Sequence, residues 1–177
     1  MKITRIATGI DVSPVLWALR EHPELWNKNP ERTESPDSPH HEVDDIWIRY
    51  GDAERVKDGL PHDSMWYPGA EILGVKNMCL DLMRGVSGVE LGGVLITRIP
   101  AGKCVKPHTD PGWHAQRYEK FAIQLASAPG QVFTVEDESL ETKPGDVFWF
   151  RNDVLHWVNN PTPYERVTMI VCIRKEP

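Results

Sequence analysis

Apolar and polar residues alternate in a series of short runs along the second half of the chain. This period of two is typical of β-strands with one buried face. We expect six such strands, at 94–99, 121–125, 131–135, 147–150, 155–158 and 166–173. Turn residues separate the runs, so the pattern predicts short strands joined by tight connections.

The first half of the chain predicts two helices, a long loop and one strand. A Ser-Pro pair begins a helix expected over about 13–22, because serine caps a helix and proline suits its first turn. Apolar residues at helical spacing predict a second helix over about 70–85. A strand is expected at 46–50. The polar, proline-rich stretch at 27–45 has no periodicity, and we expect a loop that covers a binding site.

Together these elements predict a mainly β fold. Six to eight strands behind two helices suggest a double-stranded β-helix, a jelly-roll, cupin-like barrel whose mouth can hold a metal and a small acid. The chain of 177 residues fits a single domain over 1–177. In this interpretation 92–174 form the barrel core, and 1–91 supply the supporting helices, the loop and the first strand.

Composition narrows the classes of function. The net charge of -6 makes nucleic acid an unexpected partner, because domains that bind phosphate backbones usually present a basic face. Three scattered cysteines do not form a disulfide framework. The sequence shows neither an apolar run of membrane-spanning length nor a signal-peptide pattern in its first twenty residues. We expect a cytoplasmic protein without a membrane partner.

One constellation specifies a chemistry, and it consists of His108, Asp110 and His156. Residues two apart on an extended segment point the same way, so His108 and Asp110 can reach one cation. Alternation places His156 on one face of a strand that can supply a third ligand. Two imidazoles and a carboxylate on one face of ferrous iron leave positions open for a cosubstrate and O2. These residues predict an iron oxygenase.

Arg166 strengthens this interpretation. It begins an apolar strand, where a permanently charged guanidinium is costly to bury unless an anion meets it. Its planar fork suits a carboxylate, for which 2-oxoglutarate is a candidate. The alternative is that Arg166 lies at the exposed end of the strand and pairs with Glu165 or water.

At these residues the sequence resembles the aspartyl/asparaginyl β-hydroxylase-like branch of the Fe(II)/2-oxoglutarate oxygenases, which includes free-proline hydroxylases. The resemblance covers roughly residues 92–174. Its spaced motifs, in order, are Leu-Ile-Thr-Arg-Ile-Pro-Ala-Gly at 95–102, Pro-His-Thr-Asp at 107–110, Arg117, Lys-Pro-Gly-Asp at 143–146, His156 and Arg166.

The resemblance implies roles for individual residues. Fe(II) would be held by His108, Asp110 and His156. Thr97 and Arg166 would bind the far carboxylate of 2-oxoglutarate, and Arg117 the near carboxylate. Glu119 stands where the family often has a second basic residue, a histidine, so the near-carboxylate pocket must be completed differently or Arg117 is shifted.

The implied activity is hydroxylation of a C–H bond, with 2-oxoglutarate and O2 converted to succinate and CO2. The family suggests an Asp, Asn or Pro substrate, as a free amino acid or as a residue of a peptide or protein. Candidate substrate contacts are Trp113, Arg32, His41 and Arg49.

Two other functions remain open. A metal-binding cupin, either a Zn or Mn isomerase or a binding protein, would use the same three ligands without the clamp formed by Thr97 and Arg166. An oxygenase acting on nucleobases would need stacking aromatic residues in a basic groove, which the acidic composition disfavours.

Overall fold

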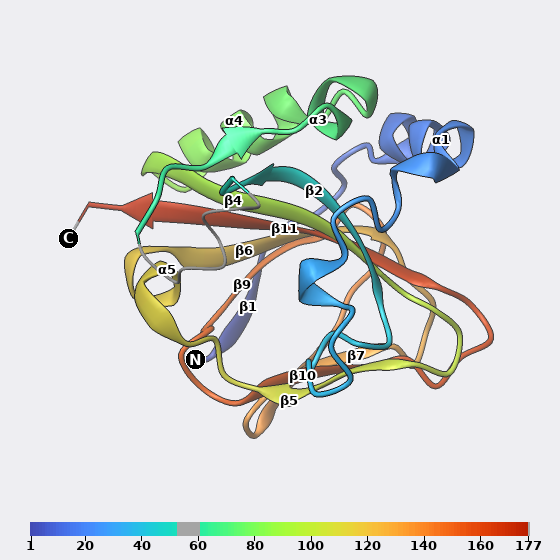
Figure 1. Cartoon of the computed structure of the whole chain (residues 1–177). Coiled ribbons are helices and arrows are strands. Elements are labelled where there is room, and N and C mark those ends of the chain that lie inside the picture. Colours follow the sequence, from blue (N-terminus) through green and yellow to red (C-terminus); the bar gives the residue numbers. More distant parts are fainter. Residues whose placement is uncertain (53–60, 177) are drawn as a thin grey trace.

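The computed structural model describes residues 1–52 and 61–176, which form two facing antiparallel sheets with helices on one outer side (Figure 1). The larger sheet has the order β1-β9-β6-β11-β4-β2-β3 and the smaller β5-β10-β7-β8. The strands are β1 Ile3–Ala7, β2 Asp44–Tyr50, β3 Met65–Trp66, β4 Gly88–Ile99, β5 Cys104–His108, β6 Glu119–Ala126, β7 Val132–Val135, β8 Glu138–Glu141, β9 Val147–Phe150, β10 His156–Asn159 and β11 Arg166–Lys175. The predicted jelly-roll barrel is confirmed.

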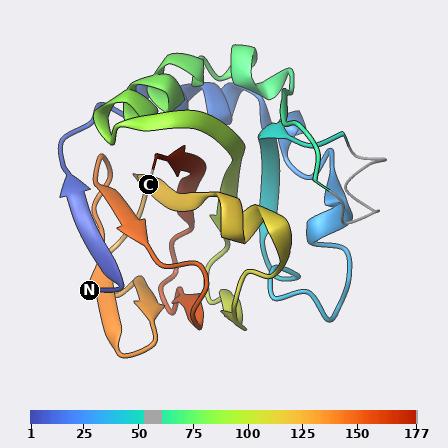
Figure 2. The same cartoon turned by 90° about the vertical axis from the view of Figure 1, so that its left-hand side faces the viewer.

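Helices cover the outer face of the larger sheet, and Figure 2 shows them together on one side of the barrel. They are α1 Ser13–Glu21, α3 Gly69–Ile72 and α4 Lys76–Gly85; α5 Gly112–Arg117 follows β5, and the 3-10 turns are η1 Pro23–Leu25 and η2 Pro30–Arg32. The prediction of one continuous helix over 70–85 is wrong in one respect, because the structure has two helices there. Gly74 adopts a φ of 63°, which interrupts the helix between α3 and α4.

Two apolar layers follow from the alternation along the strands. On β11, Val167, Met169 and Val171 pack with the helix-covered layer. The alternate residue Ile170 packs toward the layer between the sheets, which also contains Phe133 of β7. Arg166 and Ile170 are an even number of residues apart on β11. The Arg166 side chain is therefore expected on the side of the strand that is directed toward the smaller sheet.

Several elements were not predicted, and β5 is the most important of them. It contains a lysine and a proline in its five residues and lies at the edge of the smaller sheet, where one side needs no strand partner. An edge strand of this kind shows no apolar alternation. The first strand of the chain, β1, and the polar strand β8 were missed for the same reason.

The stretch expected to be a loop over 27–45 is shorter, because β2 begins at Asp44. It is also tied to the barrel. Asn27 accepts a hydrogen bond from the Asp45 amide at 3.0 Å, and the Lys106 amide of β5 donates to the Pro39 carbonyl at 2.9 Å. The loop therefore lies against the smaller sheet. Among the described residues, no helix combines the length and apolarity needed to cross a membrane.

Candidate active site

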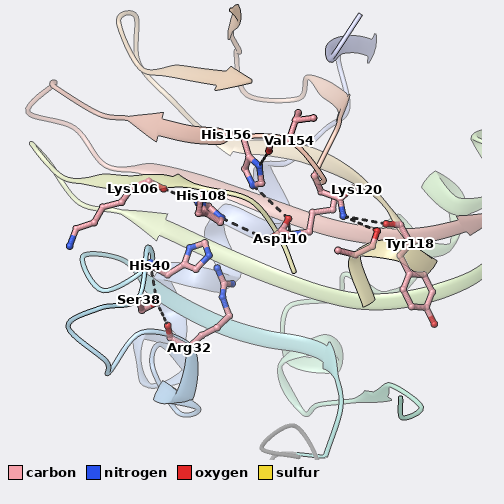
Figure 3. Close-up of polar contacts among 12 residues, drawn as sticks. Arg32, Ser38, His40, Lys106, His108, Asp110, Tyr118, Lys120, Val154 and His156 are labelled. Carbon is pink, nitrogen blue, oxygen red and sulfur yellow. Dashed lines mark hydrogen bonds and ion pairs between the residues drawn. The ribbon is translucent and has the colours of Figure 1, made fainter. Parts of the chain in front are cut away.

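The three residues with metal-ligand spacing come together in the structure (Figure 3). His108 ends β5 and His156 begins β10, and the two are direct partners across these antiparallel strands. Asp110 follows just beyond β5. The candidate ligand atoms of all three lie within 4.8 Å of one another. Strand pairing therefore brings residues that are far apart in the sequence to one point.

Both imidazoles are oriented by the backbone. Nδ1 of His108 donates to the Lys106 carbonyl at 2.8 Å, and Nδ1 of His156 donates to the Val154 carbonyl at 2.9 Å. Each Nε2 therefore faces Asp110, at 3.8 Å from His108 and 3.6 Å from His156. Burial lowers the pKa of His108, and that of His156 to about 4, so both rings are neutral near pH 7, the form in which an imidazole can bind a metal.

Asp110 is held as a carboxylate. Its burial alone would raise its pKa, but the charge and hydrogen bond of Lys120 outweigh this effect and lower the pKa. The Asp110 amide donates to the Asn152 carbonyl at 3.0 Å, which fixes the chain after β5. Two neutral imidazoles and one carboxylate are a donor set that fits a divalent first-row metal such as Fe(II).

The triad opens into a cavity of about 500 Å³ between the two sheets. Thr168, Ile170 and Cys172 of β11 contribute alternate side chains to its wall, as the strand pattern predicts. Burial raises the pKa of the Cys172 thiol to about 11. Arg32 and His40 reach the cavity from the 27–43 loop. The loop thus supplies one wall of the site.

Arg166 is two residues before Thr168 on β11, so the two side chains lie on the same face of the strand. Its side chain is 1% exposed, and it donates to the Gln131 carbonyl at 3.4 Å and to Thr142 Oγ1 at 3.1 Å. Among residues 1–52 and 61–176, its Nε has no hydrogen-bond partner and no carboxylate lies within ion-pair distance. Burial lowers its pKa to about 10, so it remains charged near pH 7. The exposed, Glu165-paired alternative is wrong.

Thr97 lines the cavity, and its hydroxyl donates to Asp45 Oδ1 at 2.7 Å. Asp45 is 1% exposed, and its other oxygen lies 3.1 Å from Nη1 of Arg32. A polar chain therefore runs from β4 through β2 to the loop. It places the Arg32 guanidinium against the cavity.

Within the described structure, Arg166 does not line the cavity itself, and neither do the predicted site residues Arg117, Trp113, His41 and Arg49. Arg117 ends α5, pairs with Glu90 at 2.7 Å and is 48% exposed. Trp113 packs near His62 and His114. Arg49 donates to the Leu91 carbonyl, and His41 bonds the Thr33 carbonyl through Nδ1.

The cavity wall also contains residues that were not assigned to the site from the sequence, among them Lys120, Tyr50, His114 and His40. Lys120 could have been found, because it shares the alternate face of β6 with Ala122 and Gln124, opposite to Phe121. His40 lies in an aperiodic loop, where no pattern separates it from His41. The Nδ1 atom of His40 is buried and has no hydrogen-bond partner among the described residues. The rings of His40 and His108 pack edge to face, with their centroids 4.8 Å apart.

We expect Asp45→Asn to loosen the loop over 27–43. The change removes the charge that holds Arg32, and losing one partner of a hydrogen-bonded buried group typically costs about 1–3 kcal/mol. Urea unfolding should show this loss, and limited proteolysis should cut the loop faster. Asp37→Asn, on the exposed part of the same loop, is the control. Equal cleavage of both variants would mean that Asp45 does not hold the loop.

A jelly-roll barrel with two histidines and one carboxylate at a cavity fits the class of metal-dependent oxygenases, and it also fits metal-binding cupins. The profile of the aspartyl/asparaginyl β-hydroxylase family matches residues 76–176, and the chain belongs to this family. It is therefore an oxygenase enzyme. A search of curated proteins found no significant match.

Solved structures share the fold at low sequence identity. A prolyl hydroxylase from Trichoplax adhaerens, in complex with a peptide fragment of the oxygen degradation domain of hypoxia inducible factor, is 12% identical, with TM-score 0.64 over 98% of this chain and 84% of that chain. A 2OG-Fe(II) oxygenase family oxidoreductase from Burkholderia pseudomallei is 14% identical (TM-score 0.59, 77% and 70% covered). A Pseudomonas putida prolyl-4-hydroxylase is 16% identical (TM-score 0.54, 99% and 94% covered).

Proposed function

We propose that this protein is an Fe(II)/2-oxoglutarate-dependent dioxygenase that hydroxylates a C–H bond of an amino acid or amino-acid residue of the Asp, Asn or Pro type. Family membership supports hydroxylase chemistry. The observation that carries the cosubstrate is Arg166, a buried guanidinium without a described counter-charge, two residues before the cavity-lining Thr168 and on the same face of β11.

Iron held by His108, Asp110 and His156 would, with 2-oxoglutarate and O2, supply C–H oxidation coupled to release of succinate and CO2. The chain's own residues bind and orient the reactants. The backbone bonds to both Nδ1 atoms hold the imidazole Nε2 atoms toward one point. No side chain needs to act as a general base for this chemistry.

The far carboxylate of 2-oxoglutarate is assigned to Arg166. A buried charge costs several kcal/mol unless it is paired, so an anion that enters from the cavity relieves an existing cost. Thr97 lies on the neighbouring strand, where Thr97 and Thr168 are direct partners. Because the Thr97 proton is donated to Asp45, we expect a smaller contribution from this hydroxyl.

The substrate is expected to enter past the 27–43 loop. Arg32 is the best placed of the four predicted contacts, because it lines the cavity and can meet a carboxylate of the substrate. Trp113, His41 and Arg49 would contact only substrate parts outside the cavity. A bound peptide in the Trichoplax enzyme favours including peptides among the candidates. A cytoplasmic location is also proposed, supported by three free cysteines.

Succinate release is the direct test. The iron-loaded protein with 2-oxoglutarate should release succinate in the presence of its substrate, measured across a panel of free amino acids and of peptides with central Asp, Asn or Pro. Mass spectrometry should then find one added oxygen on that substrate. Tight Zn binding without any turnover of 2-oxoglutarate, even the slow uncoupled reaction, would instead indicate a metal-binding cupin.

A further inference from the structure

The near carboxylate of the cosubstrate, the one beside the keto group, still lacks a protein contact. Arg117 has the expected spacing, but it lies on α5 with its guanidinium paired to Glu90 and partly in solvent. Two described Lys or Arg side chains line the cavity, and they are Arg32 and Lys120. Arg32 pairs with Asp45, which is outside the triad, whereas Nζ of Lys120 contacts the triad residue Asp110. Lys120 is therefore the cation next to the triad.

Lys120 lies at the start of β6, where it is the register partner of Phe150 on β9 and of Cys172 on β11. Its side chain is 20% exposed and turns into the barrel, and Nζ donates to Asp110 Oδ2 (Figure 3). An ammonium has three donors. Asp110 accepts one of them, which leaves donors for another oxygen bound close to the triad.

We propose that Lys120 binds the near carboxylate of 2-oxoglutarate and takes the positioning role that sequence spacing assigns to Arg117. The inference rests on the proposed function, because it concerns the cosubstrate of that reaction. Lys120 contacts a triad residue and lines the cavity, whereas Arg117 does neither. The assignment also explains how the chain can have Glu119 at a position that is often basic in the family, because Lys120 supplies the positive charge.

The charges of the site favour this assignment. Asp110 is the one carboxylate that the described residues place in the cavity wall. A divalent metal together with Lys120 outweighs its single negative charge. A carboxylate bound beside the metal would restore the balance, and Lys120 would hold it through a charge-assisted hydrogen bond.

Removing Lys120 should move two affinities in opposite directions. Its ammonium competes with a metal ion for Asp110, so Lys120→Met should bind Co(II) at least as tightly as the wild type. The same variant should bind 2-oxoglutarate roughly tenfold to a hundredfold more weakly, the loss expected for one charge-assisted hydrogen bond. General damage to the fold would weaken both.

The experiment uses anaerobic Fe(II)-loaded full-length protein and calorimetric titration with 2-oxoglutarate and with pyruvate, which has the 2-oxo acid end but no far carboxylate. Lys120→Met should weaken both ligands. Arg166→Leu should weaken 2-oxoglutarate only. Lys143→Met removes the same charge from an exposed turn and should change neither, and Lys120→Arg should restore most of the affinity.

The outcomes separate the two proposals. If wild-type protein binds 2-oxoglutarate in the presence of iron and Lys120→Met binds it equally well, Lys120 is not the contact, although the proposed function stands. The same holds if Arg117→Met weakens both ligands and Lys120→Met weakens neither. If iron-loaded wild type binds neither acid, the proposed function fails and the role of Lys120 fails with it.

Discussion

His156→Ala is expected to abolish specific Fe(II) binding and, with it, all hydroxylation. His156 is 3% exposed, and its imidazole is fixed by the Val154 carbonyl, so the mutation removes a ligand that the fold holds in place. Loss of even an outer partner of a metal ligand typically costs about 10- to 100-fold in affinity, and loss of a ligand should exceed this.

Anaerobic addition of Fe(II) and 2-oxoglutarate should give the wild type a weak visible charge-transfer band that His156→Ala and His108→Ala lack. His22→Ala is the matched control, because His22 is an exposed residue next to α1 that pairs with Glu24. A band of wild-type strength in His156→Ala would mean that the metal lies elsewhere.

Arg166→Leu should raise the dissociation constant for 2-oxoglutarate roughly tenfold to a hundredfold while Fe(II) binding persists. One charge-assisted hydrogen bond contributes about 1.5–3 kcal/mol, which corresponds to this range. The cosubstrate-free variant should be no less stable than wild type, because leucine removes a buried charge that lacks a described counter-charge. Weaker 2-oxoglutarate binding without a loss of stability would identify Arg166 as an anion contact. Loss of a structural residue would also lower the stability of the cosubstrate-free protein.

Thermal unfolding of the iron-loaded proteins measures both effects. At 2-oxoglutarate concentrations of about 100 times the wild-type dissociation constant, the wild type should gain about 2.7 kcal/mol, and a variant with hundredfold weaker binding about 0.4 kcal/mol. The stabilisation of Thr97→Val by 2-oxoglutarate should lie between these two values. Arg151→Leu, which breaks an exposed pair with Asp153, serves as the control. Equal stabilisation of Arg166→Leu and wild type would place the clamp elsewhere.

The sequence predicts the barrel because residue types alternate along its central strands. One face of each strand packs under the helices, and the alternate residues face the layer between the two sheets. β9 matches its expected range, and β6 and β11 extend the expected strands by a few residues. The limit appears at β5, where Lys106 and Pro107 interrupt any apolar alternation although the strand holds a metal-ligand candidate. Pairing with β10, rather than local pattern, makes it a strand.

The same distinction explains which site residues could be predicted. His108 and Asp110 are close in sequence, and the face of His156 follows from the alternation of its strand. Arg117 and Lys120 are separated by the end of a helix and the start of a strand. The backbone changes from one geometry to the other between them, so counting residues from His108 does not tell which side chain turns inward.

The buried thiol of Cys172 bears on how long such an enzyme can work. Oxidants attack the thiolate far faster than the thiol, and the damage becomes irreversible beyond the sulfenic acid. Because burial raises the pKa of Cys172 to about 11, only a minute fraction is thiolate near neutral pH. The barrel thus keeps a sulfur that faces its own oxidative chemistry in the form that resists self-inactivation.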